Sequence, residues 1–138
     1  MTDKAYQVSM EFQPGVRRRL VLVSSDKAFA ESLRSHLAVE FDVLMARNAG
    51  EAAAKAQAVS SHMVIVDLGA PVLGMAALGR LKSLSPSPIV CSLVVPGAST
   101  TESGFEFDYV LARPTSGADM PERIRFILAK AKGESNIA

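Results

Sequence analysis

Short apolar runs alternate with helix-period stripes along most of this chain, and that alternation limits the folds it can adopt. The apolar runs, such as RLVLV, MVIV and IVCSLVV, are short enough for strands and are bounded by polar or turn-forming residues. Between most of them, apolar residues recur every three or four positions, as on one face of a helix. Strands that alternate with helices in this way predict a parallel sheet with right-handed crossovers and helices on both faces.

The boundaries of the expected elements follow from these runs. Strands are predicted at residues 19–23, 41–45, 63–66, 89–95 and 109–112, and helices at 27–38, 49–59, 74–84 and 119–132. Capping residues stand at the expected helix starts, namely Ser25 or Asp26, Asn48 with Glu51, and Asp119 with Glu122. The stretch PGASTTESG has no helical stripe, so a fourth helix there is short or missing. We therefore expect a flavodoxin-like α/β fold, a five-stranded parallel sheet in the order 2-1-3-4-5.

The length of the chain and its charge balance restrict the domain organisation and the partners. With 138 residues, 49% of them apolar, the chain can build one domain around one core. We expect residues 18–132 to form it, with 1–17 as a flexible arm and 133–138 as a frayed tail. The net charge of +1 gives no reason to expect nucleic acid binding. The arginines at 17–19 are expected to solvate the entry of the chain rather than to bind phosphate.

The sequence also indicates the compartment. Cys91 is the single cysteine and lies in an apolar run, so it is expected to be a buried small hydrophobe in a reducing environment. The first residues lack an apolar signal core, and no apolar run approaches the roughly 20 residues that cross a bilayer. A cytoplasmic protein without membrane insertion is the resulting prediction.

Polar residues collect where the predicted strands end. They are Ser24, Ser25 and Asp26 after the first strand, Asp67 at the end of the third, Ser92 near the end of the fourth, and Arg113 after the fifth, and the apolar Leu93 and Pro114 directly follow the last two. In an open α/β sheet the working crevice lies outside the carboxyl ends of the strands, at the point where the strand order reverses. These residues are therefore expected to gather in one crevice.

This arrangement over residues 18–132 resembles the response-regulator receiver family of two-component signalling. The residues that carry the resemblance are Asp67 with Pro71 in VDLGAP, and the pair Arg113 and Pro114 in place of Lys-Pro. The resemblance implies that Asp67 is the candidate phosphate acceptor. The segment VLVSSD is also similar to the receiver-like domain at the start of certain pilus-assembly ATPases.

The chain departs from the family pattern at the metal site. Ser24 and Ser25 stand where the family has the acidic pair that holds Mg²⁺, and a neutral hydroxyl is a poor ligand for a hard dication. Asp26 and Asp67 remain as weak metal-ligand candidates, so Mg²⁺ binding is expected to be weak or absent. Alternatively, the serines only cap the first helix.

Two further departures concern the lysine and the switching hydroxyl of the family. Arg113 replaces the lysine, and a guanidinium can hold a carboxylate through two hydrogen bonds. A lasting pair with Asp67 would fix the crevice without phosphorylation, whereas the alternative is an exposed arginine at a strand end. The position of the hydroxyl falls on Leu93 when counted from Pro88, or on Ser92 if the register slips by one.

We therefore predict an atypical receiver domain that acts by binding signalling proteins, either a histidine kinase or a downstream effector, with weak or absent phosphorylation at Asp67. One alternative is a conventional receiver in which Asp67 accepts phosphate. Another is a structural or localisation adaptor that forms a homodimer through its last helix or through the face of its fourth and fifth strands.

Enzymatic functions are disfavoured by the same residues. His36 and His62 are the only histidines, so neither a metal cluster nor a Ser/His/Asp arrangement can be assigned, and no catalytic residue is predicted. The spacing from Gly69 to Gly74 is that of a phosphate-binding loop, but Met75 stands where that loop needs a lysine. A flavin site would need a loop rich in Ser, Thr and Gly after the first strand, which this chain lacks.

Overall fold

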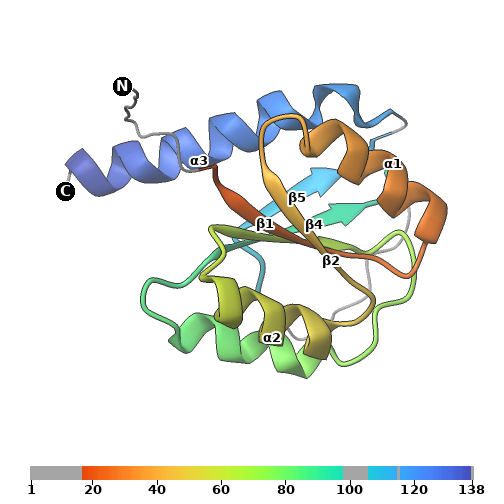
Figure 1. The fold of residues 1–138 in the computed structure, drawn as a ribbon, viewed down its shortest axis with the longest axis horizontal. Coiled ribbons are helices and arrows are strands. Elements are labelled where there is room, and N and C mark those ends of the chain that lie inside the picture. Colours follow the sequence, from red (N-terminus) through yellow and green to blue (C-terminus); the bar gives the residue numbers. More distant parts are fainter. Residues whose placement is uncertain (1–16, 98–105, 115, 138) are drawn as a thin grey trace, which may run out of the picture.

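The computed structural model describes residues 17–97, 106–114 and 116–137 as a five-stranded parallel sheet with helices on both faces (Figure 1). The strands are β1 (Arg19–Val23), β2 (Asp42–Ala46), β3 (Met63–Asp67), β4 (Ile89–Val94) and β5 (Tyr109–Ala112). The α-helices are α1 (Lys27–Leu37), α2 (Ala49–Val59) and α3 (Met120–Ile137), and the 3₁₀ helices are η1 (Met75–Ser83) and η2 (Gly117–Asp119). The strand order is β2-β1-β3-β4-β5, and each neighbouring pair is parallel, which confirms the predicted fold.

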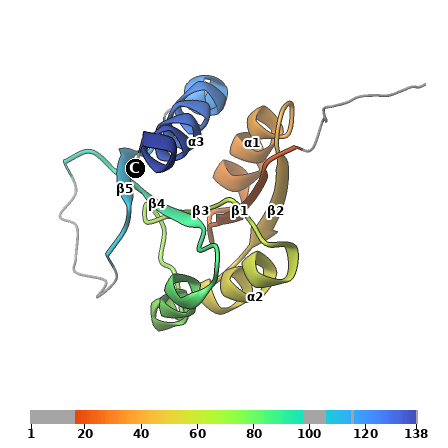
Figure 2. The same ribbon diagram turned by 90° about the vertical axis from the view of Figure 1, so that its left-hand side faces the viewer.

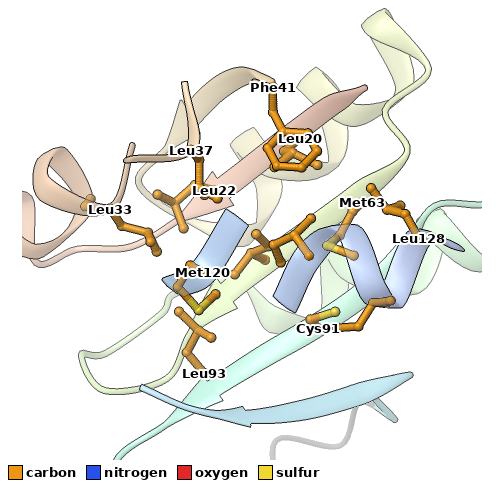
Figure 3. Packing of buried hydrophobic residues seen from close by; sticks show 14 residues of the cluster. Leu20, Leu22, Leu33, Leu37, Phe41, Met63, Cys91, Leu93, Met120 and Leu128 are labelled. Atoms are coloured by element: carbon orange, nitrogen blue, oxygen red, sulfur yellow. The ribbon is translucent and has the colours of Figure 1, made fainter. Parts of the chain in front are cut away.

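Two hydrophobic clusters hold the layers together, one on each face of the sheet. Seen along the sheet, α1 and α3 cover one face and α2 covers the other (Figure 2). Large side chains fill the α1 and α3 side, among them Leu20, Leu33, Phe41, Met63 and Met120 (Figure 3). The opposite cluster consists mainly of valines and alanines, because the alanine-rich α2 packs close to the strands. Burial of these apolar surfaces is the main force that fixes the layers.

The segment predicted as a third α-helix is a 3₁₀ helix instead. Met75, Leu78, Leu81 and Leu84 recur every three residues and all pack against the α2 side of the sheet. A 3₁₀ helix has three residues per turn, so this spacing places Met75, Leu78 and Leu81 on one line, and Leu84 follows as the extended residue that ends the helix. Gly79 further weakens an α-helix at this point. The three-residue period was present in the sequence and distinguishes η1 from the α-helix that we expected.

The ends of the other elements lie close to the predictions, with one larger difference at α3. Ser116, rather than Asp119, caps the start of this region, and its side chain accepts a hydrogen bond from the backbone N–H of Ala118 in η2. Asp119 is the last residue of η2 and forms an ion pair with Arg123. The helix continues to Ile137, past its predicted end. The prediction of a short or missing fourth helix falls mainly on residues 98–105, which lie outside the described residues.

The arginines before and within β1 bind the ends of two helices, which corrects the expectation that they only solvate the chain. Arg17 donates to the carbonyl oxygens of Ala38, at the end of α1, and of Phe41, the latter at 2.8 Å. Arg19 donates through Nε to the carbonyl of Val59, the last residue of α2, at 2.7 Å. Cationic donors at helix C-termini satisfy carbonyls that have no partner within the helix and complement the helix dipole.

Two smaller predictions can also be compared with the structure. Cys91 is fully buried in β4, as predicted, and this burial raises the pKa of its thiol to about 12. Within the described part of the chain, no helix is long and apolar enough to span a membrane.

Candidate functional site

The candidate site is the crevice at the carboxyl ends of β1, β3 and β5. Asp67 is the last residue of β3, Ser24 and Asp26 follow β1, and Arg113 follows β5. Strand β1 lies beside β3, while β5 is two strands away, so Arg113 has to reach across the end of β4. The parallel sheet therefore brings residues from distant parts of the sequence to one edge, as we expected.

Asp67 is fully buried, and both oxygens of its carboxylate are occupied. Oδ2 accepts a hydrogen bond from Ser24 Oγ at 2.8 Å and another from Arg113 Nη2 at 3.1 Å. Oδ1 accepts from Arg113 Nε at 3.0 Å and from the backbone N–H of Gly69 at 2.9 Å. A carboxylate has about four acceptor positions in all. These four donors therefore occupy all the acceptor positions of the Asp67 carboxylate.

Arg113 binds a second carboxylate, that of Asp26, in addition to Asp67. Its Nη2 also donates to Asp26 Oδ2 at 2.7 Å, and its guanidinium lies 3.9 Å from the centre of the Phe29 ring. The side chain of Arg113 is 20% exposed, so water screens these contacts less than it screens a surface ion pair. Two charge-assisted contacts and a cation–π contact thus hold this side chain in place.

The electrostatics of the cluster follow from that placement. The hydrogen bond from Arg113 lowers the pKa of Asp26 below its ordinary value, and the backbone N–H of Phe29 acts in the same direction. For Arg113, desolvation works to lower the pKa, but the hydrogen bonds that it donates to Asp26 and Asp67 outweigh it and the pKa is raised. The guanidinium therefore stays charged between the two carboxylates.

The two serines after β1 have separate roles. Ser24 donates to Asp67 and accepts a hydrogen bond from the backbone N–H of Asp26 at 3.0 Å. Ser25 donates to the carbonyl oxygen of Pro71 at 2.8 Å, which ties the loop after β1 to the loop after β3. The cap of α1 is Asp26, whose Oδ1 accepts from the N–H of Phe29 at 3.1 Å. The alternative that the serines only cap this helix is therefore wrong.

The register of β4 places Leu93, and not Ser92, beside Asp67. Leu93 is the partner of Asp67 in the ladder between β3 and β4 and is buried in the cluster under α1 and α3. Successive side chains of a strand point to opposite faces, so Ser92 points to the face that carries α2 and η1. Its hydroxyl is buried there without a hydrogen-bond partner among the described residues. Consequently, neither residue brings a hydroxyl to Asp67.

Pro114 and Gly69 complete the description of the site. Pro114 follows Arg113 directly and lines a surface pocket with Ser116 and Arg123. Gly69 was not identified from the sequence as a site residue, although it donates to Asp67 and lies against Arg113. A glycine two residues after a strand-terminal aspartate is a weak signal, because glycine is common in such loops.

The residues of this crevice do not fit the Mg²⁺ ion that the receiver resemblance implies. Mg²⁺ needs oxygen ligands in near-octahedral geometry, usually with one or two free carboxylates. Here the guanidinium of Arg113 engages both Asp26 and Asp67. Among the residues that the structure describes, no group of three or more His, Cys, Asp or Glu side chains is arranged to hold a metal. The positive charge beside Asp67 comes from the protein itself.

Comparison with known proteins identifies the fold through structure rather than sequence. No protein-family profile matches the sequence, and no curated protein matches it. A response regulator receiver domain protein from Methanospirillum hungatei JF-1 superposes with a TM-score of 0.70 and 22% identity, covering 86% of this chain and 99% of that chain.

Two further receiver structures are similar over most of their length. The signal receiver domain of an HD domain-containing protein from Pseudomonas fluorescens Pf-5 has a TM-score of 0.66 and 20% identity, covering 98% of each chain. A receiver domain from Methylobacillus flagellatus has a TM-score of 0.63 and 19% identity, covering 81% of this chain and 99% of its own. The chain described here has the CheY-like fold of response-regulator receiver domains.

Proposed function

We propose that this protein is an atypical receiver domain in two-component signalling, which acts by binding a histidine kinase or a downstream effector and whose Asp67 accepts phosphate weakly or not at all. The fold and the position of Asp67 at the end of β3 support a receiver origin. The single observation that supports weak or absent phosphorylation is that Ser24, Gly69 and Arg113 already donate hydrogen bonds to both oxygens of the Asp67 carboxylate.

The chemistry of phosphoryl transfer explains why these hydrogen bonds matter. Catalysis of such transfers depends almost entirely on positioning and on neutralising charge around the phosphoryl oxygens. In this crevice the cation that could neutralise charge is hydrogen-bonded to the nucleophile itself. An incoming phosphoryl group would have to displace Arg113 from Asp67, and no acidic pair stands ready to bring in a metal ion. Both effects slow phosphorylation.

Binding of a partner would not need that chemistry. Arg113 supplies permanently the positive charge that metal and lysine supply in the family pattern, so the crevice stays in one state. A surface formed by the elements around it would then be presented constantly. This proposal predicts that partner binding is independent of phosphodonors and of Mg²⁺.

The direct test is to incubate the protein with acetyl phosphate and Mg²⁺ and to measure the intact mass. A conventional receiver domain that acetyl phosphate labels, treated in parallel, controls for the activity of the phosphodonor. We expect no phosphoryl adduct on this protein under conditions that label the control. An adduct that appears on the wild type and disappears in Asp67→Asn would instead establish a conventional receiver.

A gain-of-function variant tests whether the named residues are the cause. Ser24→Asp, Ser25→Asp and Arg113→Lys together restore the acidic pair and the lysine of the family pattern. We expect this triple variant to acquire an adduct that Asp67→Asn abolishes. If the folded triple variant remains unlabelled, the cause does not lie in these three positions.

A second measurement follows the crevice without covalent chemistry. Beryllofluoride with Mg²⁺ mimics an aspartyl phosphate, so in a conventional receiver it should shift amide resonances around the acceptor aspartate. We expect the ¹H–¹⁵N spectrum of the wild type to remain unchanged, and that of the triple variant to shift near Asp67. Shifts of the same size in both proteins would contradict the proposal.

A further inference from the structure

Gly69 lies so close to Arg113 that there is no room for a side chain at position 69 in this arrangement. A Cβ atom built on Gly69 would stand 2.6 Å from both Cδ and Nε of Arg113, and 3.0 Å from Cζ. Non-bonded carbon atoms have their optimal separation near 3.5 to 4.0 Å, so a methyl group at this position overlaps the arginine. One of the two groups would have to move.

The backbone does not explain this glycine. Gly74 and Gly97 have φ values of 75° and 83°, a region that favours glycine for its own conformation, whereas Gly69 lies outside that region. Its N–H donates to Asp67, and any residue other than proline would keep that donor. What glycine contributes here is therefore the absence of a side chain.

Arg113 is also unable to give way without losing its partners. The same stretch of side chain that a Cβ would meet, from Cδ to Cζ, carries the Nε that donates to Asp67. The Phe29 ring restricts movement of the guanidinium in another direction, because its centre lies 3.9 Å from Arg113 Cζ. Displacement of Nε by about 1 Å directly away from Asp67 Oδ1 would lengthen its 3.0 Å hydrogen bond beyond the range in which such bonds form.

We propose that Gly69 is a positioning residue for Arg113, and that its missing side chain is what lets one guanidinium hold Asp67 and Asp26 together. A methyl group at position 69 moves Arg113 off the buried carboxylate. This inference concerns the same crevice as the proposed function, but it does not depend on whether Asp67 accepts phosphate. The two can therefore fail separately.

The Nε–H resonance of Arg113 reports directly on the hydrogen bond between Nε and the Asp67 carboxylate. It is assigned as the arginine ¹H–¹⁵N cross-peak that disappears in Arg113→Lys. In the wild type, the hydrogen bond to Asp67 should protect this proton from exchange with water. In Gly69→Ala we expect exchange to become faster on the order of tenfold, equivalent to the loss of about 1.4 kcal/mol of protection.

Gly79→Ala is the matched control, because a Cβ at Gly79 meets nothing within 4 Å and its φ is not positive. The exchange rate of the Arg113 proton should stay at the wild-type value in this variant. Unchanged exchange in Gly69→Ala overturns the inference. Equal acceleration in both variants overturns it too, since the effect would then not be local to Gly69.

Thermal unfolding provides a second test if Gly69→Ala alone does not fold. Removal of Arg113 clears the space, so adding Gly69→Ala to Arg113→Ala should leave the Tm unchanged or raise it slightly, because alanine restricts the unfolded chain. In the wild-type background, the same substitution should lower the Tm or prevent folding. A lowering of the Tm by the same amount in both backgrounds would show that Gly69 is needed for some reason other than Arg113.

Discussion

Arginines stabilise both ends of the sheet, but the groups that they hydrogen-bond differ in chemistry and in burial. At the amino ends of the strands, Arg17 and Arg19 donate to backbone carbonyls at and just after the ends of α1 and α2. At the carboxyl ends, Arg113 donates to the side-chain carboxylates of Asp67 and Asp26. Arg17 and Arg19 satisfy neutral backbone dipoles, and the Asp42 carboxylate that also pairs with Arg17 is exposed, whereas Arg113 compensates a fully buried charge.

This difference determines how much stability the protein should lose when each arginine is removed. A carbonyl at a helix end can be solvated by water once its arginine is gone, because these ends lie near the surface. Asp67 is fully buried, and loss of its cation leaves a carboxylate with only two neutral donors, Ser24 and Gly69. A buried charge without its partner is among the most destabilising defects in a protein.

The largest effect is therefore expected for Arg113→Ala. Removal of one partner of a buried pair should lower the free energy of unfolding by about 3 kcal/mol or more, measured by urea denaturation at neutral pH. Asp67→Asn in the same background removes the uncompensated charge and should recover part of the loss. A cost of less than about 1 kcal/mol for Arg113→Ala would erase the contrast between the two ends of the sheet.

A smaller effect is expected for Arg19→Ala at the other end. Loss of the hydrogen bonds to Val59 and Ser60 and of the favourable charge at the end of α2 should cost about 1 kcal/mol. Arg19→Lys keeps the charge and should recover some of that stability. A cost as large as that of Arg113→Ala would mean that the amino-end contacts are as critical as the buried pair.

Acidification should weaken the ion pair between Asp26 and Arg113 without protonating the carbonyl acceptors at the other end of the sheet. Because the pKa of Asp26 is lowered in the folded protein, its pairing stabilises the fold fully above the ordinary value of 3.8 and is lost as the pH falls through the lower, folded pKa. The stability difference between wild type and Asp26→Asn, whose asparagine can still cap α1, should therefore shrink below about pH 4.

Arg19 provides the comparison for that titration. Its carbonyl acceptors do not titrate, but burial and the charge of Arg19 lower the pKa of the neighbouring His62, so the cost of Arg19→Ala should fall as His62 gains a proton below pH 7. Urea denaturation of these variants at several pH values measures both differences. If the difference for Asp26→Asn stays constant down to pH 3, its ion pair with Arg113 contributes nothing to stability in solution.

The sequence predicted the elements of this fold well because their signals are local. An apolar run such as Met63 to Val66 has no polar face, so it indicates a strand covered on both sides. Asp26 and Asn48 each precede a helical stripe, and both cap their helices in the structure. The third helix lies where it was predicted but is a 3₁₀ helix, and the repeat of Met75, Leu78 and Leu81 every three residues is the local signal for that type.

The position of the site was also predictable, since parallel strands bring their carboxyl ends to one edge whatever their order in the chain. The contacts within the site were not. Whether Arg113 reaches Asp67 or remains exposed depends on the distance across β4, on the room beside Gly69 and on the ring of Phe29. Those are relations between residues far apart in the sequence.

By itself, then, the sequence determined the element order, the strand topology and the edge at which Asp67 and Arg113 meet, because each depends on local pattern and on general rules of parallel sheets. Tertiary structure alone decided that Arg113 bridges two carboxylates, that Ser92 turns away from Asp67, and that Arg17 and Arg19 bind helix ends. The physical reason is that a side chain's partners are set by three-dimensional proximity and burial, which no local pattern records.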